Sequence, residues 1–349
     1  MGKKIREGDK KMRTKTLLTA IVLLCIAVFS TACGTQEKAS TTSEKEEFKK
    51  IRVANWSKPI TEQTNLLVDE KKEFFKDKGL DVTVLPGAGG GDAVKNILSG
   101  KADIAFTDPG SVFFALDKGE KLKVIYNIYP QNVFNIVSLK EKNITKPEDL
   151  KGKTIGVYSL TSGTRQNLLV LLHEAGLTEK DVKIVETGIS NFAPLMQGQV
   201  DATAATDTGL AAGKQKGLGA VNVMEVKDSL NVPSDVFVVT EKTYQEKKEE
   251  LKQFLAAYQD SAEWMIESPE EAASLAKKYA IDGTDEEQNL EIIKLRNTSS
   301  VSSLTDEKGL GALDTTVLQQ AADTYQKLGL IKNKLNMEEV VNQELLPKR

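Results

Sequence analysis

The chain has 349 residues, of which 40% are hydrophobic and 28% are charged, and its formal net charge is −3 at pH 7. This length is enough for two ordinary domains, and the slightly acidic balance excludes the strongly basic surface by which proteins hold nucleic acid. The whole sequence contains two cysteines and one histidine, so neither a disulfide framework nor a metal site is indicated, and we expect no cofactor.

The N-terminal 32 residues have the layout of a secretory signal peptide. Residues 17–29 (LLTAIVLLCIAVF) form an uncharged apolar run that is too short to span a bilayer, and basic residues precede it. Small residues then lead into Cys33, in a context that resembles the lipobox of bacterial lipoproteins with Ser30 in place of the usual leucine. We expect cleavage before Cys33 and acylation of this cysteine, which would anchor the protein at the extracytoplasmic face of the cell membrane.

Removal of this peptide leaves a more acidic chain. Residues 1–32 hold seven of the 47 Lys and Arg and two of the 50 Asp and Glu, so 40 basic and 48 acidic residues remain. Residues 33–48 are rich in Ser, Thr and charged side chains with almost nothing to bury, and we expect a flexible tether there. The sequence leaves open whether translation starts at Met1 or at Met12.

Beyond the tether, short β-branched segments alternate with helical ones. The segments IRVANW (51–56), DVTVLPG (81–87) and DIAFTD (103–108) are typical of strands, and DAVKNILSG (92–100) and VFFALDKG (112–119) are typical of helices. This alternation predicts an α/β fold with largely parallel sheets.

The same order of segments recurs about a hundred residues later. KGLDVTVLPG (78–87) returns as AGLTEKDVKIVETG (175–188), and LSGKADIAFTD (98–108) returns as MQGQVDATAATD (196–207). Two similar units predict two lobes, each a mostly parallel sheet flanked by helices, with a ligand cleft between them. We expect residues 49–131 and 235–349 to form the first lobe and residues 132–234 the second, with the last helices serving as packing material.

Ligands bind such sheets at the carboxyl ends of the strands, so the candidate contacts come from the loops there. In the first lobe they are Trp56, Gly90, Asp92, Thr107, Asp108 and Tyr129. The glycines at 89–91 would let the backbone approach a ligand closely, although Asp92 breaks the dinucleotide pattern G-x-G-x-x-G. The aspartates are explained equally well as helix caps, and the aromatic residues as core.

In the second lobe the candidates lie at the start of a helix. They are Thr161, Ser162, Gly163 and Thr164, which offer hydroxyl and free backbone N–H groups, followed by Arg165, whose guanidinium would complete a sulfonate or carboxylate site. Ordinary helix capping is the alternative. Asp207 is the counterpart of Asp108 in the first lobe, and two aspartates in a cleft favour a solute with hydrogen-bond donors. A zwitterion such as taurine would satisfy both requirements.

One long run carries a resemblance to a known family. KPEDLKGKTIGVYSLTSGTRQNLLVLLHEAGL (146–177), followed by DVKIVETG and LMQGQVDA, resembles the solute-binding proteins of ABC importers for nitrate, sulfonates, taurine and thiamine-type pyrimidines. The likeness extends over roughly residues 50 to 335. It implies a type 2 periplasmic-binding-protein fold, capture of a small solute by lobe closure, and delivery by a monomer to a membrane permease and its ATPase. A sulfonate or taurine-like solute is our first expectation, and a planar nitrogen heterocycle is the second.

Two other classes of function remain to be weighed. A tethered sensor would keep the fold and present its solute to a receptor. An enzyme is not expected, because His173 is the only histidine and lies inside a helical run, and no G-x-S-x-G is present. Relatives on this fold that make the thiamine pyrimidine use a histidine and a cysteine cluster, and the chain after Cys33 has no cysteine.

Overall fold

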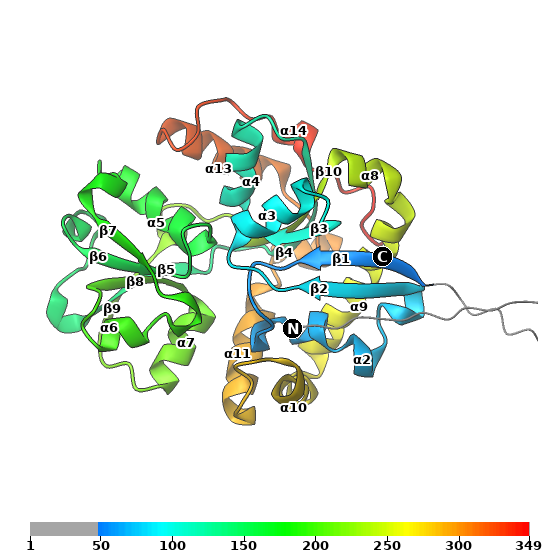
Figure 1. Cartoon of the computed structure of the whole chain (residues 1–349), viewed down its shortest axis with the longest axis horizontal. Helices are drawn as coiled ribbons and strands as arrows, with labels where there is room; N and C mark the ends of the chain where they lie inside the picture. Colours follow the sequence, from blue (N-terminus) through cyan, green and yellow to red (C-terminus); the bar gives the residue numbers. More distant parts are fainter. Residues whose placement is uncertain (1–47, 349) are drawn as a thin grey trace, which may run out of the picture. The chain divides into compact units, whose positions relative to one another are not determined.

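Two five-stranded sheets organise residues 48–348, the part of the chain that this computed structural model describes (Figure 1). The first sheet contains β1 (Lys49–Ala54), β2 (Leu80–Leu85), β3 (Ile104–Thr107), β4 (Leu122–Tyr129) and β10 (Asp235–Thr240). The second contains β5 (Phe134–Leu139), β6 (Thr154–Val157), β7 (Lys183–Glu186), β8 (Ala202–Thr206) and β9 (Val221–Glu225). The expected signal peptide, Cys33 and the tether up to residue 47 lie outside the described residues.

The two sheets have the same plan. Their strand orders are β2-β1-β3-β10-β4 and β7-β6-β8-β5-β9, so the half-repeat in the sequence has a direct counterpart in the topology. In the first sheet β10 runs antiparallel to both of its neighbours while the other pairings are parallel, and β5 takes the same place in the second sheet. Four strands of each sheet therefore point one way, which confirms the expected α/β fold with mostly parallel sheets. The reversed strand is in each case the first one after the chain crosses between sheets.

Helices cover both faces of each sheet. The helices that precede the return to the first sheet are α1 (Thr64–Leu67), α2 (Asp69–Lys72), α3 (Gly90–Leu98), α4 (Pro109–Asp117), α5 (Gly163–Glu174), α6 (Ala193–Met196) and α7 (Asp207–Gln215). Short 3-10 helices occupy connections: η1 (Thr61–Gln63), η2 (Lys76–Lys78), η3 (Lys140–Lys142), η4 (Pro147–Leu150), η5 (Glu179–Asp181), η6 (Gly188–Ser190) and η7 (Val226–Asp228).

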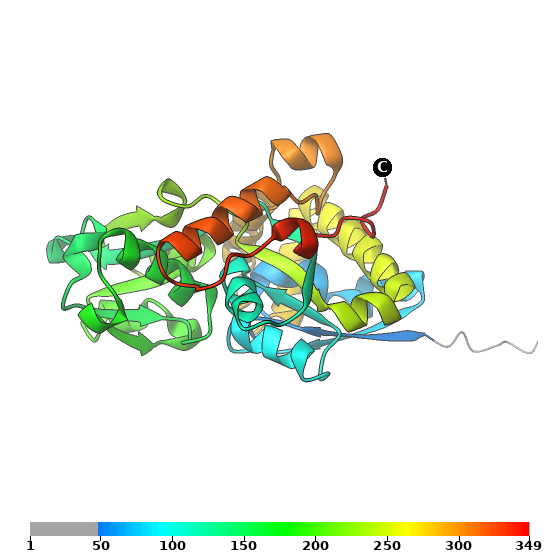
Figure 2. The same cartoon turned by 90° about the horizontal axis from the view of Figure 1, so that it is seen from above.

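The remaining helices follow β10. They are α8 (Glu241–Glu246), α9 (Lys248–Glu267), α10 (Pro269–Tyr279), α11 (Glu286–Ser299), α12 (Ser303–Lys308), α13 (Thr315–Lys327) and α14 (Met337–Val340). Just past the end of α13, the carbonyl oxygen of Leu328 lies 2.8 Å from Nδ1 of His173 on α5, so this part of the chain reaches the second lobe (Figure 2). Among residues 48–348, no helix combines the length and the apolar character that crossing a membrane requires.

Strand β10 shows how the alternating pattern builds two cores. Val236 and Val238 pack with helices α3, α4 and α13 on one face of the first sheet, whereas Phe237 and Val239 pack with α1 and α9 on the other. Successive side chains of a strand point to opposite faces, so the central residues 236–239, which are buried on both faces, are all apolar. In the second sheet, α5 covers one face, and α6 and α7 contribute to the core on the other. This packing fixes the strand ends, and with them the loops that form the site.

Candidate functional site

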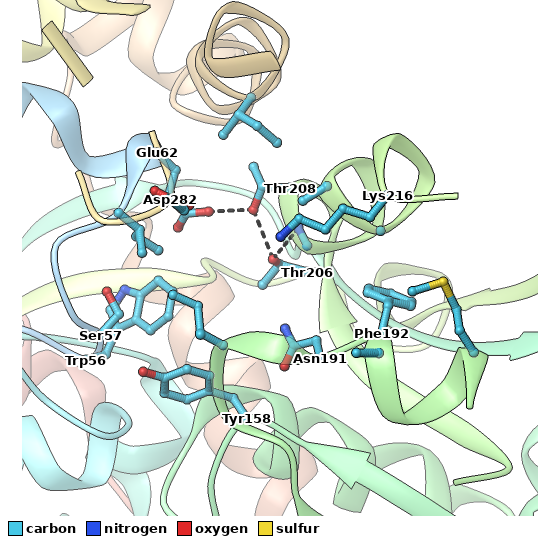
Figure 3. A pocket seen from close by; sticks show the side chains of 18 residues that line it. Trp56, Ser57, Glu62, Tyr158, Asn191, Phe192, Thr206, Thr208, Lys216 and Asp282 are labelled. Atoms are coloured by element: carbon cyan, nitrogen blue, oxygen red, sulfur yellow. Dashed lines mark hydrogen bonds between the residues drawn. The ribbon is translucent and has the colours of Figure 1, made fainter. Parts of the chain in front are cut away.

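Two adjoining cavities lie where loops from the two lobes meet. The outer cavity has a volume of about 190 Å³ and the inner one about 30 Å³, and both are lined by Trp56, Tyr158 and Thr206. The inner cavity is completed by Gly90, Asp108, Phe134, Ser162, Gly163, Thr164 and Asp235. The polar side chains of the outer cavity include Ser57, Glu62, Asn191, Thr208, Lys216 and Asp282 (Figure 3). Asp108 and Tyr158 directly follow β3 and β6, and Phe134 and Asp235 open the antiparallel strands β5 and β10, so these residues meet at the carboxyl ends of the parallel strands.

An aromatic pair forms the wall that the two cavities share. Trp56 follows β1 of the first lobe and Tyr158 follows β6 of the second, and their ring centroids are 5.9 Å apart with the planes at 83°. The indole Nε1 of Trp56 is buried and has no hydrogen-bond partner within the described residues. Aromatic faces bind planar or methylene-bearing groups, and an unpaired buried N–H calls for an acceptor. The wall therefore suits a flat solute with at least one hydrogen-bond acceptor.

Carboxyl groups define the inner cavity. Asp108 caps α4: its Oδ1 accepts from the Ser111 backbone N–H at 2.8 Å and its Oδ2 from the Ser111 hydroxyl at 2.7 Å. Burial raises the pKa of Asp108 to about 6 in spite of these bonds. Burial also raises the pKa of Asp235, at the start of β10, well above its usual value, and the charge of Asp108 adds to this shift. Asp108 is thus both a helix cap and a cavity residue, and the cavity favours neutral or cationic groups over anions.

A buried arginine connects the two lobes beside the outer cavity. Arg296 of α11 is 1% exposed, and its Nη2 donates to Glu62 Oε2 at 3.0 Å, to Asp207 Oδ1 at 3.1 Å and to Thr208 Oγ1 at 3.0 Å. Its guanidinium carbon lies 4.4 Å from the ring centroid of Tyr129. Burial alone would lower the pKa of Arg296, but the charges of Asp207 and Glu62 outweigh burial and raise it. The arginine is therefore a permanent cation held by acids from both lobes.

The same residues bond to one another. Thr208 donates its hydroxyl to Glu62 in a short hydrogen bond, and Ser299 Oγ donates to Asp207 Oδ2 at 3.1 Å. Glu62, Arg296 and Ser299 belong to the first lobe, whereas Asp207 and Thr208 belong to α7 of the second. We call this group, Glu62, Asp207, Thr208, Arg296 and Ser299, the ion cluster. It ties α11 to α7 across the boundary between the lobes.

The glycine-rich loop of the first lobe makes a second contact between lobes. The Gly91 N–H donates to the Thr161 carbonyl oxygen at 2.8 Å, and a Cβ at Gly89 would lie 2.7 Å from that oxygen. Thr161 Oγ1 in turn donates to the Ala88 carbonyl oxygen at 3.2 Å. At Gly90 a Cβ would lie 2.2 Å from Asp108 Oδ2, so only glycine fits at this wall of the inner cavity. Gly89 and Gly91 thus allow the backbones of the two lobes to lie in contact here.

The structure brings six of the residues that the sequence singled out to the cavities. They are Trp56, Gly90, Asp108, Ser162, Gly163 and Thr164. The last three bring the start of α5 to the inner cavity, and there the Thr164 hydroxyl accepts from the Tyr158 N–H at 3.0 Å and lies 2.7 Å from the Ser162 hydroxyl.

The other six lie elsewhere. Arg165 donates to Glu179 at 2.6 Å and lines a separate groove of about 710 Å³ with Thr161, so it is not among the residues that line the two cavities. Tyr129 lies against Arg296, and Asp207 is part of the ion cluster. Asp92 accepts from the Ala88 N–H at 3.3 Å, and Thr107 is fully buried, with an Oγ1 that a Cβ at Gly90 would approach to 2.6 Å.

Glu62, Tyr158, Asp235 and Arg296 are among the residues of the site that the sequence reasoning missed. Tyr158 lies between β6 and the predicted residues Thr161 to Arg165, and Asp235 opens β10, at the point where the chain was expected to return to the first lobe. The strand ends thus carry the signal that could have identified both. Arg296 lies on one of the helices that were expected only to pack. Among residues 48–348, no group of three or more His, Cys, Asp and Glu side chains is arranged to hold a metal ion.

Comparisons with known proteins agree with this arrangement. Residues 60–272 match the family described as NMT1/THI5 like. The chain is similar to the riboflavin-binding protein RibY of Chloroflexus aurantiacus, at 24% identity over 70% of each chain. It is also similar to the formylaminopyrimidine-binding protein of Halalkalibacterium halodurans, at 23% identity over 82% of this chain and 85% of that one.

A solved structure shows the fold. The alkanesulfonate-binding protein SsuA of Xanthomonas axonopodis pv. citri, bound to MOPS, superposes with a TM-score of 0.68 over 84% of this chain and 98% of that one, at 16% identity. The two sheets are thus arranged as in periplasmic binding proteins. Because the family match spans more than half of its residues, the chain belongs to the NMT1/THI5-like family.

Proposed function

We propose that this protein is the extracytoplasmic solute-binding lipoprotein of an ABC importer, and that its solute is a small planar nitrogen heterocycle with hydrogen-bond donors, such as an aminopyrimidine. One observation carries the proposal: the inner cavity is lined both by the aromatic residues Trp56 and Tyr158 and by the acidic residues Asp108 and Asp235. The rings suit a flat molecule, and the carboxyl groups favour a solute that carries hydrogen-bond donors over an anion.

The relatives support this class of solute. The names of two of them specify riboflavin and formylaminopyrimidine, and both compounds are nitrogen heterocycles. Loops from both lobes surround the cavities, and this arrangement supports capture of the solute by lobe closure. A solute held there would be shielded from water until the lobes separate at the permease.

The sulfonate or taurine-like solute has less support. Arg165, the cation on which that expectation depended, is paired with Glu179. The inner cavity instead carries Asp108 and Asp235, which would repel an anionic head group whenever either is ionised. The fold is shared with an alkanesulfonate-binding protein, but a fold hosts many ligands.

A ligand screen tests the proposal. The purified protein is heated with aminopyrimidines, with riboflavin and with alkanesulfonates including taurine. A solute at a hundredfold excess over its dissociation constant should add about 2.7 kcal/mol to the free energy of unfolding and raise the melting temperature accordingly. We expect the shift with nitrogen heterocycles. A shift with sulfonates alone would overturn the choice of solute.

The anchor and the transport role are tested in cells. Cys33→Ser should leave the protein unprocessed or release it from the membrane fraction, and unchanged processing and membrane association would remove the lipoprotein assignment. Deletion of the gene should abolish uptake of the solute found in the screen. Normal uptake combined with a lost transcriptional response to the solute would instead favour a tethered sensor.

A further inference from the structure

Glu62 has one carboxylate oxygen bound and one without a partner. It lies on η1, is 3% exposed and lines the outer cavity (Figure 3). Its Oε2 accepts from Arg296 Nη2 at 3.0 Å and from the hydroxyl of Thr208. Its Oε1 is buried and has no hydrogen-bond partner in the described part of the chain. A buried carboxylate oxygen without a donor is costly, so a partner is to be expected when the site is filled.

The bound oxygen fixes the direction of the free one. Two donors from different lobes hold Oε2, and the carboxylate is planar, so Oε1 has little freedom to turn toward another group. Trp56 lines the same cavity, and its Nε1 is a buried donor without an acceptor among residues 48–348. Two residues that line the outer cavity thus each carry a buried polar atom without a partner: an acceptor on Glu62 and a donor on Trp56.

We infer that Glu62 determines which solute is bound: its Oε1 accepts a hydrogen bond from an N–H group of the solute, while Trp56 Nε1 donates to an acceptor of the same molecule. Arg296 acts as a positioning residue, because it reaches the solute only through Glu62. The inference rests on the proposed function and narrows it. An aminopyrimidine supplies a donor and an acceptor, whereas an alkanesulfonate without an amino group supplies acceptors alone and would leave Glu62 unpaired.

A substitution at Glu62 gives an asymmetric prediction. In Glu62→Gln the amide oxygen must face Arg296, because the guanidinium can only donate. The amide NH₂ then occupies the place of Oε1 and presents a donor to the cavity. The preference of the site should therefore reverse from solutes with an amino group to solutes with an acceptor at the same position.

Calorimetry with two probes measures this preference. The probes are 4-amino-2-methylpyrimidine and 4-methoxy-2-methylpyrimidine, which differ in whether the substituent donates. We expect the wild type to prefer the amino probe by at least tenfold, because the methoxy probe leaves a buried charged acceptor unpaired. Glu62→Gln should prefer the methoxy probe. Glu291→Gln, the same change on an acid of α11 that accepts from Gln215 at 2.6 Å, should keep the wild-type ratio.

The outcomes separate the inference from the proposed function. Equal affinity ratios in the wild type and Glu62→Gln would overturn the role of Glu62 while leaving an importer of pyrimidines in place. Failure of the wild type to bind either probe, with binding of a sulfonate, would overturn the proposed class of solute instead. If Glu62→Gln does not fold, the wild type is instead measured with a third probe, 4-dimethylamino-2-methylpyrimidine. This probe lacks an N–H donor, and wild-type affinity for it equal to that for the amino probe would refute the inference.

Discussion

In this structure loops from both lobes meet around the cavities, and we call this the closed arrangement. Arg296→Met tests whether the ion cluster stabilises it. The wild-type guanidinium is 1% exposed and donates to Glu62, Asp207 and Thr208, which come from both lobes. Methionine is also long and unbranched but has no donor. Both carboxylates would therefore lose their cation at a site from which water is largely excluded.

The structure sets the size of the effect. Removal of one partner from a buried ion pair costs about 3–5 kcal/mol, because the other charge stays buried. The Glu62 side chain is 4% exposed and bears this cost in full, whereas that of Asp207 is 25% exposed and keeps its bond from Ser299. We therefore expect the lower end, about 3 kcal/mol. Opening of the lobes would return both acids to water, so the penalty falls on the closed form.

Calorimetry with the solute identified by the screen measures this penalty. A closed form less stable by about 3 kcal/mol should weaken solute binding about a hundredfold. The free energy of unfolding of the solute-free protein, measured in urea, should fall by less, since the variant can open. Lys294→Met is the control: this lysine lies on the same helix and pairs with Glu270 at 3.3 Å, but both side chains are exposed. If Arg296→Met bound the solute within threefold of this control, the reasoning would be wrong.

Two further predictions concern the inner cavity. Gly90→Ala would place a Cβ 2.2 Å from Asp108 Oδ2, and displacement of that carboxyl should weaken solute binding about tenfold or more in calorimetry. Gly219→Ala, where a Cβ meets nothing within 4 Å, should bind as the wild type does. Burial raises the pKa of Asp108 to about 6, so this carboxyl binds its proton more tightly in the folded state than in the unfolded state. The stability that it contributes is complete below about pH 4 and is lost as the pH rises through 6. Measured by urea unfolding, the free energy of unfolding of the wild type should fall by about 3 kcal/mol over this pH range, and that of Asp108→Asn should not. An identical pH dependence in variant and wild type would contradict the raised pKa of Asp108.

The fold could be predicted because its signals are local and repeated. The recurrence of the strand and helix segments in residues 78–108 and 175–207 corresponds to two sheets with one strand order. The segment at 196–207 is one residue longer than the segment at 98–108, and the helix caps differ by one position as well: Asp108 caps α4, whereas Thr206, the residue before Asp207, caps α7. Trp56 and Asp108, which line the inner cavity, could be proposed as contacts because parallel strands place their carboxyl ends at one edge.

The rest of the site depends on contacts between distant residues. Arg296 and Glu62 are 234 positions apart, and no spacing rule links them. Thr164 and Arg165 are neighbours at the start of α5, but only Thr164 lines the inner cavity, where its hydroxyl accepts from the Tyr158 N–H. The guanidinium of Arg165 instead donates to Glu179, 14 positions later. Helix periodicity gives the angle between two such side chains but not which neighbour lies at either angle.

The position of the ion cluster makes closure depend on what fills the site. In the closed arrangement Arg296 satisfies one oxygen of Glu62, while the other oxygen and Trp56 Nε1 are left without partners among the described residues. In an open arrangement water can reach both atoms, so closure around an empty or mismatched site trades hydrated groups for unpaired ones. A solute with a matching donor and acceptor removes that cost. The same carboxylate that holds the lobes together through Arg296 and Thr208 would thus also select the solute for which they close.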